Sequence, residues 1–181
     1  METQILFAGF GGQGVLSMGQ FLTYAAMEAG KNVAWVPSYG AEMRGGTANC
    51  LVTIADEEIS SPITENPMTA VIMNGPSLDK FESKVKPNGI LVLNSSMVDR
   101  KPDRQDLQVL ELPVNQIAEE INNPRGANMI LLGAYLQKTG VVEIEKVLEY
   151  FEKIFKGKKP SIIENNKEAF MTGVEYARQK W

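Results

Sequence analysis

The sequence predicts a three-layer α/β/α domain with a mostly parallel, mixed sheet. Three observations lead to this fold class. The chain begins with a short apolar run, a glycine-rich turn and a helix-compatible segment, the pattern of a strand, a turn and a helix. Apolar runs typical of buried strands then recur and alternate with helical patterns. The nine residues 38–46 are too short for a usual parallel crossover, so the strand after them should run antiparallel to the strand before them or lie elsewhere in the sheet.

Apolar periodicity and turn residues set the expected elements within one domain, residues 1–181. Ser77 is expected to cap the second helix, and a short return at residues 59–63 is expected to follow the third strand. The strands are expected at residues 5–8, 32–36, 47–55, 69–73, 90–93 and 107–112, and the helices at 15–29, 78–85, 113–121, 128–138, 142–155 and 164–180.

The residue types that are scarce or missing limit the chemistry of the chain. It has no histidine, which excludes imidazole catalysis and histidine metal sites. Its one cysteine, Cys50, lies in an alternating strand pattern and is interpreted as a core residue, and a single thiol cannot hold an iron–sulfur cluster. The net charge of −4 predicts no nucleic-acid partner. No apolar run is long enough to span a membrane, so a cytoplasmic protein with no membrane association is expected.

The spacing Gly9-x-Gly11-x-x-Gly14 matches a dinucleotide-binding fingerprint. In an NAD-binding unit, an acidic residue about 20 positions later should end the second strand and hold the ribose hydroxyls. Here that strand ends in Pro37 and Ser38. The sequence therefore predicts a Rossmann-like fold that differs from a standard NAD-binding fold.

Three loops that follow strands compete for a functional role: residues 9–14, 38–46 and 74–77. If their strands are parallel neighbours, all three loops meet at one edge of the sheet. Arg44 could clamp a carboxylate or phosphate, or it could pair with Glu42 or with a partner subunit. The glycine turn could bind a nucleotide or serve only close packing.

No catalytic residues and no metal ligands are assigned to the chain. It contains no obvious pair of catalytic carboxylates, no cluster of metal ligands and no Walker-type phosphate loop. A domain with a ligand-shaped edge but no self-sufficient catalytic group is expected to be one component of a larger enzyme.

Three segments, GFGGQGV at residues 9–15, PSYGAEMRGGTANC at 37–50 and MNGPSLDKF at 73–81, together resemble the gamma subunit of the 2-oxoacid:ferredoxin oxidoreductases. The resemblance covers essentially the whole chain. Members of that family oxidatively decarboxylate a 2-oxoacid to an acyl-CoA and CO2 and pass electrons to ferredoxin. The resemblance thus implies an oxidoreductase subunit that is inactive in isolation. Among substrates it favours 2-oxoglutarate, with pyruvate and branched-chain 2-oxoacids as alternatives.

The resemblance also implies partners and cofactors. The partners are alpha and beta subunits, with a delta subunit in a four-chain arrangement, and ferredoxin reaches the protein through the complex. Coenzyme A is the co-substrate, while thiamine diphosphate, Mg and [4Fe-4S] clusters are expected on the partner subunits. Contacts to coenzyme A or to a companion subunit are expected from Gly9, Gly11, Gly12, Gln13, Gly14, Ser38, Tyr39, Gly40, Glu42, Arg44, Gly45, Gly46 and Asn74.

Two other functions remain as alternatives. A free-standing nucleotide-binding oxidoreductase component would purify with a bound cofactor and act without partners. A purely structural assembly subunit would contribute no group to turnover.

Overall fold

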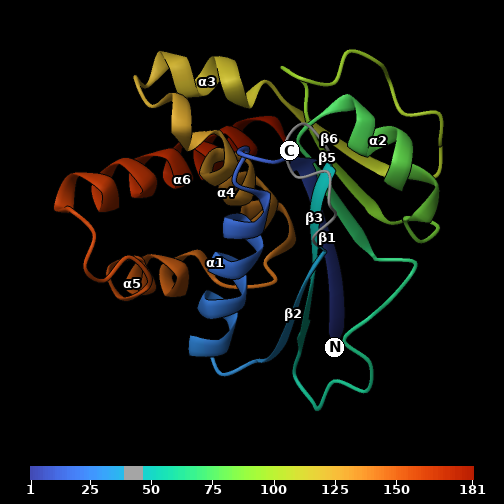
Figure 1. The fold of residues 1–181 in the computed structure, drawn as a ribbon, viewed down its shortest axis with the longest axis horizontal. Coiled ribbons are helices and arrows are strands. Elements are labelled where there is room, and N and C mark those ends of the chain that lie inside the picture. The colour runs from blue at the N-terminus through green and yellow to red at the C-terminus, as the bar shows by residue number, and fades with distance from the viewer. Residues whose placement is uncertain (39–46) are drawn as a thin grey trace.

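The computed structural model describes residues 1–38 and 47–181 (Figure 1). Six strands form one mixed sheet in the order β2-β3-β1-β4-β5-β6. The strands are β1 (Glu2–Phe10), β2 (Asn32–Ser38), β3 (Thr47–Ala55), β4 (Thr69–Ile72), β5 (Ile90–Asn94) and β6 (Gln108–Leu112).

The direction of β3 makes the sheet mixed. β3 pairs antiparallel with both β1 and β2, whereas β1, β4, β5 and β6 pair parallel with one another in that order. Five strands therefore run in one direction and β3 runs in the other, which confirms the prediction from the short connection before it.

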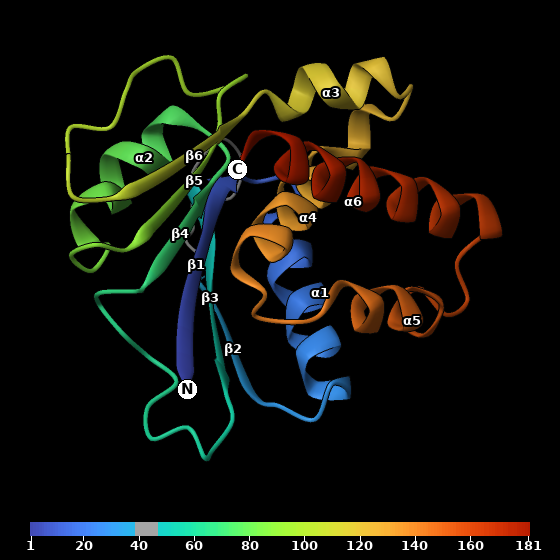
Figure 2. The ribbon, with the colours of Figure 1, turned by 180° about the vertical axis from the view of Figure 1, so that it is seen from behind.

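Helices cover both faces of the sheet, as predicted for three layers (Figure 2). One face carries α1, α4, α5 and α6, while α2 and the turn η1 cover part of the other face. The helices are α1 (Val15–Glu28), α2 (Gly75–Phe81), η1 (Glu82–Lys84), α3 (Val114–Glu120), η2 (Pro124–Gly126), α4 (Ala127–Thr139), α5 (Ile144–Ile154) and α6 (Pro160–Lys180).

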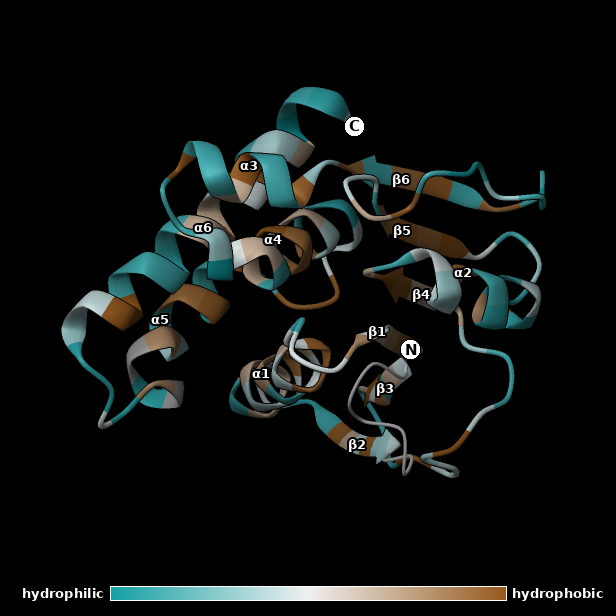
Figure 3. Cartoon of the chain, turned by 45° about the horizontal axis from the view of Figure 1, so that its top comes forward, coloured by the Kyte–Doolittle hydropathy of each residue, from teal (hydrophilic) through white to brown (hydrophobic). Residues whose placement is uncertain are grey.

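The side chains of the sheet divide between two cores. Alternate residues of β3, including Cys50 and Val52, join the larger core under the four helices, and Leu51 joins the smaller core under α2. This matches the faces that the alternating pattern predicts. Hydrophobic colour is concentrated on the strands and on α4, whereas much of α6 is hydrophilic (Figure 3).

Helices α4 and α6 approach each other at backbone distance. A Cβ built on Gly133 would lie 2.0 Å from the carbonyl oxygen of Phe170, and one built on Gly173 would lie 1.9 Å from that of Ile130. Real Cβ atoms need more than 3 Å here, so only glycine permits this crossing. The sequence pattern predicted the helix at residues 164–180 but assigned no role to Gly173.

Three local predictions are wrong. Asn74, not Ser77, caps α2: its side-chain oxygen accepts a hydrogen bond from the Ser77 amide at 2.9 Å. Helix α6 begins at Pro160 rather than at residue 164, because proline suits a first helical turn, where its missing N–H is not needed. Residues 59–63 form no strand and belong to the loop between β3 and β4.

A buried carboxylate holds the loop between β5 and β6 against α2. The Glu82 side chain is 7% exposed; it lies 3.0 Å from the Arg100 guanidinium and accepts a hydrogen bond from the Arg104 amide at 2.8 Å. The Glu82 side chain thus supplies the loop with both an ion-pair partner for Arg100 and a hydrogen-bond acceptor for the Arg104 amide.

Replacing Glu82 by alanine is expected to lower the free energy of unfolding by about 2 kcal/mol, because it leaves the Arg104 amide unpaired and removes a partner of Arg100. Urea unfolding measures this change, and limited proteolysis should cut near residues 99–106 more rapidly. Asp103→Ala is the control. Asp103 lies 3.8 Å from Arg100 but is 91% exposed, so the change should stay within about 0.5 kcal/mol. Equal effects of the two variants would contradict this role of Glu82.

Candidate functional site

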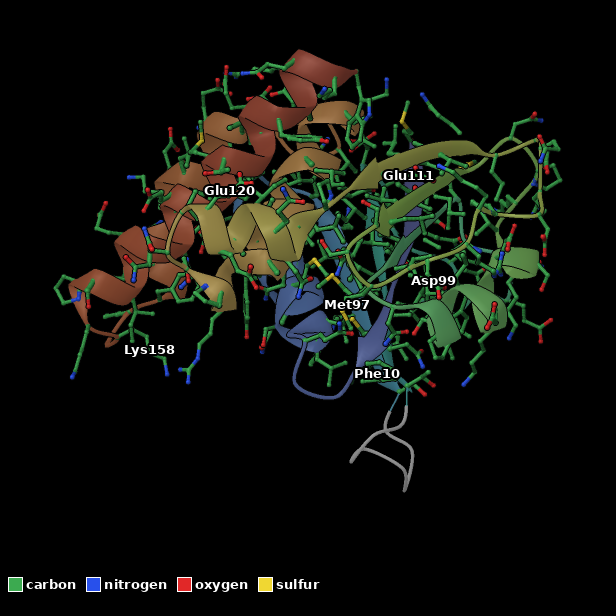
Figure 4. The ribbon with its side chains drawn as sticks, turned by 90° about the horizontal axis from the view of Figure 1, so that it is seen from above. Phe10, Met97, Asp99, Glu111, Glu120 and Lys158 are labelled. Atoms are coloured by element: carbon green, nitrogen blue, oxygen red, sulfur yellow. The ribbon has the colours of Figure 1, made fainter. Side chains whose placement is uncertain are left out.

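Two of the three expected loops meet at the carboxyl edge of the sheet. β1 and β4 are parallel neighbours, so the turn 9–14 and the loop that begins at Asn74 emerge side by side. Figure 4 looks down on this edge, with Phe10 at the end of β1. Ser38 lies on the same edge, at the end of β2. Residues 39–46, and with them Tyr39, Gly40, Glu42, Arg44, Gly45 and Gly46, lie outside the described part of the chain.

The side chain of Gln13 joins the glycine turn to β4. Its oxygen accepts hydrogen bonds from the Phe10 amide at 2.6 Å and from the Asn74 side-chain amide at 3.2 Å. Its nitrogen donates to the carbonyl oxygen of Met73 at 3.3 Å. The amide therefore fills the inner side of the turn, between the ends of the two strands.

The glycines of the turn serve different purposes. A Cβ on Gly9 would lie within 3 Å of Gln13, Met73 and Val15, so this position needs a close approach. Gly12 and Gly14 have positive φ angles of 99° and 76°, which favour glycine. A Cβ on Gly12 would meet no described atom within 4 Å, and both Gly11 and Gly12 are exposed. A ligand can thus approach the outer side of the turn, whereas Gln13 blocks the inner side.

Further asparagines extend this amide network, and the sequence analysis assigned no role to them. The Asn94 side chain, fully buried, donates to the carbonyl oxygen of Met73 at 3.2 Å and to the Asn115 side chain at 2.8 Å. Asn128 lies over the turn and donates to the carbonyl oxygen of Gly14 at 3.4 Å. A usable signal was that Asn94, like Asn74, comes directly after a buried apolar run.

The position of β3 separates this fold from a standard dinucleotide-binding unit. In that unit the strand after the first helix lies beside β1 and presents a ribose-binding acid close to the glycines. Here β3 lies between β1 and β2, so the end of β2 lies about 10 Å from β1, at two strand spacings instead of one. The described turn therefore lacks an acidic neighbour at the usual ribose position, in agreement with Ser38 at the end of β2.

Cys50 is a core residue, as predicted. Its side chain is fully buried, and burial raises the pKa of its thiol to about 11, so the thiolate form is disfavoured. Among the side chains that the structure describes, no three acidic or cysteine residues gather as a possible metal site. Among the described helices, none has the length and apolar character needed to cross a bilayer.

Comparison with known proteins places this fold and edge in a family. Residues 4–176 match the family described as pyruvate ferredoxin/flavodoxin oxidoreductase. The chain belongs to this family. Its match covers β1 through most of α6 and includes the glycine turn, so the membership concerns the whole described fold.

Two family relatives show different chain lengths. The ketoisovalerate oxidoreductase subunit VorA of Methanothermobacter marburgensis is 37% identical over 98% of this chain, which spans only 37% of that relative. The 2-oxoglutarate synthase subunit KorC of Methanocaldococcus jannaschii is 33% identical over 99% of this chain and 96% of its own length. The same domain thus occurs within a much longer chain and as a chain of its own size.

Two solved structures share the fold. The gamma subunit of a keto/oxoacid ferredoxin oxidoreductase from Geobacter sulfurreducens superposes with a TM-score of 0.83, at 27% identity, over 98% of this chain and 99% of that one. The 2-oxoglutarate:ferredoxin oxidoreductase from Magnetococcus marinus gives a TM-score of 0.88, also at 27% identity, over 99% of this chain and 32% of that one. The second structure is described with 2-oxoglutarate, coenzyme A and succinyl-CoA bound.

Proposed function

We propose that this chain is the gamma subunit of a multi-subunit 2-oxoacid:ferredoxin oxidoreductase, which converts a 2-oxoacid and coenzyme A to an acyl-CoA and CO2 with electrons passed to ferredoxin. The observation that carries the proposal is the TM-score of 0.88 over 99% of the chain to an enzyme described with coenzyme A bound. Alpha and beta subunits, with a delta subunit in a four-chain arrangement, would hold the thiamine diphosphate, Mg and [4Fe-4S] clusters.

In this proposal the carboxyl edge of the sheet contributes to the coenzyme A site or to the contact with a companion subunit. The exposed backbone at Gly11 and Gly12 offers amides to an anion such as a phosphate group. Gln13 and Asn74 hold that backbone in place from the inner side. This chain's part in the reaction is therefore to bind and orient, because thiamine diphosphate supplies the decarboxylation chemistry when it is bound on a companion chain.

The preferred 2-oxoacid remains a prediction, and we keep 2-oxoglutarate as the expected acid. The relatives are named for ketoisovalerate and for 2-oxoglutarate at similar identity, and the family description names pyruvate. The purified complex should be assayed with the three acids in parallel. A higher kcat/KM for pyruvate or ketoisovalerate than for 2-oxoglutarate would show that 2-oxoglutarate is not the preferred substrate.

The proposal is tested by reconstitution. Mixing the chain with purified companion subunits should produce acyl-CoA only when all subunits, coenzyme A and an electron acceptor are present. Titration of the isolated chain with NAD(H) and FAD tests the alternative of a free-standing nucleotide-binding component. Tight binding of either cofactor, or turnover without partners, would overturn the proposed function.

Replacing Arg44 by alanine separates a role in turnover from one in assembly. If Arg44 binds a coenzyme A phosphate, loss of a charge-assisted contact should raise the KM for coenzyme A about tenfold while the complex still assembles. The KM and the elution volume of the complex are the measurements. Loss of assembly with unchanged kinetics in the remaining complex would instead support the purely structural role.

A further inference from the structure

A groove of about 720 Å³ is lined by residues of α1, η2, α4, α5 and α6 and of the α5–α6 connection. Its floor contains the buried side chains of Phe21 and Met129, and the partly buried ring of Phe155 adds to the apolar surface. Helix α1 forms one rim. It presents Ser17, Gln20 and Tyr24, all exposed.

The charge of this groove is opposite to that of the chain as a whole. Among the described side chains that line it, three are cations, Arg125, Lys153 and Lys158, and one is a carboxylate, Glu28, although the chain carries a net charge of −4. Lys153 already lies 3.3 Å from Glu28. Arg125 and Lys158 form no ion pair with any described side chain, and both are exposed.

These cations come from different parts of the chain. Arg125 belongs to η2, Lys153 to α5, and Lys158 to the connection between α5 and α6. In Figure 4 the end of the molecule near Lys158 extends nitrogen-tipped side chains into solvent. A solvated helix end would explain lysines gathered at residues 153–159, but it would not explain why Lys153 and Lys158 line one groove with Arg125 over an aromatic floor.

The shape of the groove favours a polypeptide over a small molecule. Pockets for small ligands enclose about 70–90% of the ligand surface, whereas the α1 rim and the cations here are open to solvent. A segment of a partner chain can lie in such an open groove and seat one apolar side chain against Phe21 and Phe155, whose ring centroids are 5.9 Å apart. In VorA the region similar to this chain is only 37% of the polypeptide, so further polypeptide accompanies the domain there.

We propose that this groove binds an acidic segment of a companion subunit, with carboxylates facing Arg125 and Lys158 and an apolar side chain on the aromatic floor. The proposal rests on the proposed function, because it takes the occupant from the same complex. It adds a docking surface formed by α1, η2 and the α5–α6 connection.

The test is a charge reversal of Arg125 and Lys158, the two groove cations without an ion pair to a described side chain. The double variant Arg125→Glu, Lys158→Glu should bind the purified companion subunits with a dissociation constant raised about tenfold or more, because attraction becomes repulsion at a desolvated contact. Raising the salt concentration should weaken the wild-type complex more than the variant complex. Circular dichroism melting verifies that the variant folds, which is expected because both side chains are exposed.

The matched control reverses two lysines of the same connection that do not line the groove, Lys156→Glu and Lys159→Glu. It changes the net charge equally and should leave the dissociation constant within about twofold of the wild-type value. Unchanged binding by the groove variant, or equal weakening by both variants, would overturn the proposal.

Hydrogen exchange on the reconstituted complex gives an independent measurement. Residues 17–28 and 153–166 should exchange more slowly in the complex than in the free chain. If coenzyme A alone protected these segments from exchange, the groove would be a site for a small anion. That result would overturn the proposal that a polypeptide segment binds there. If the wild-type chain supports no acyl-CoA formation with its companions, the proposed function fails. If the wild-type chain supports turnover but the groove variant binds the companion subunits normally, the proposed docking surface is wrong and the proposed function stands.

Discussion

Replacing Gly173 by alanine should destabilise the protein by about 3 kcal/mol, although alanine normally favours a helix over glycine by about 1 kcal/mol. The sign reverses because the new Cβ would lie 1.9 Å from the carbonyl oxygen of Ile130. That atom belongs to the backbone of α4, so no side-chain rotation relieves the clash and the two helices must move apart. Denaturant unfolding of the isolated chain measures the loss.

Gly133→Ala should have a similar effect, because its Cβ would meet the Phe170 carbonyl oxygen in the same crossing. The double variant should lose less unfolding free energy than the two single variants lose together. Helices that the first methyl group has already separated accommodate the second one. Gly75→Ala in α2 is the control: its Cβ would meet only the Met97 carbonyl oxygen, at 3.9 Å, so stability should change by less than about 0.5 kcal/mol. A neutral Gly173 variant would falsify this account of the crossing.

Replacing Gln13 by alanine should impair both the stability of the glycine turn and turnover by the complex. It leaves the Phe10 amide without its side-chain acceptor and removes the links to Met73 and Asn74, for an expected loss of about 2 kcal/mol of unfolding free energy. If the outer side of the turn orients coenzyme A, a displacement of about 1 Å should lower kcat/KM for coenzyme A about 100-fold. Unfolding curves and coenzyme A kinetics measure the two effects.

Gln13→Glu separates these effects, because it keeps the acceptor for Phe10 but replaces the donor to Met73 with an oxygen, which repels the carbonyl oxygen. It should retain the fold while still lowering kcat/KM. Gln116→Ala is the control, since Gln116 is exposed and its side chain donates a hydrogen bond to the exposed Glu120. Wild-type coenzyme A kinetics in both Gln13 variants would show that the turn has no part in binding coenzyme A.

Local sequence patterns predicted most helices and strands, because the periodicity of a helix or strand is set by residues that are close in sequence. The apolar stripe on α5, for example, packs in the core with Val147 and Phe151 fully buried. Two of the three errors concern helix starts, where one side chain decides, and the third is the strand expected at residues 59–63, which the structure lacks. Asn74 and Ser77 are both good caps, and only the backbone geometry shows that Asn74 accepts the hydrogen bond. The glycines correctly predicted a sharp turn after the first strand. The hydrogen bonds of Gln13 on the inner side of this turn could not be predicted from the sequence.

By itself, the sequence determined that this chain is a Rossmann-like α/β protein with one antiparallel strand, a buried thiol and a glycine turn at the end of its first strand. Spacing, periodicity and the length of one connection carry that information. Tertiary structure alone decided that β3 separates β1 from β2, that Gln13 bonds to a carbonyl 60 residues away, and that Arg125 meets Lys158 over an aromatic floor. These features join segments far apart in the chain, and their pairing is set by the packing of whole helices and strands, which no local pattern records.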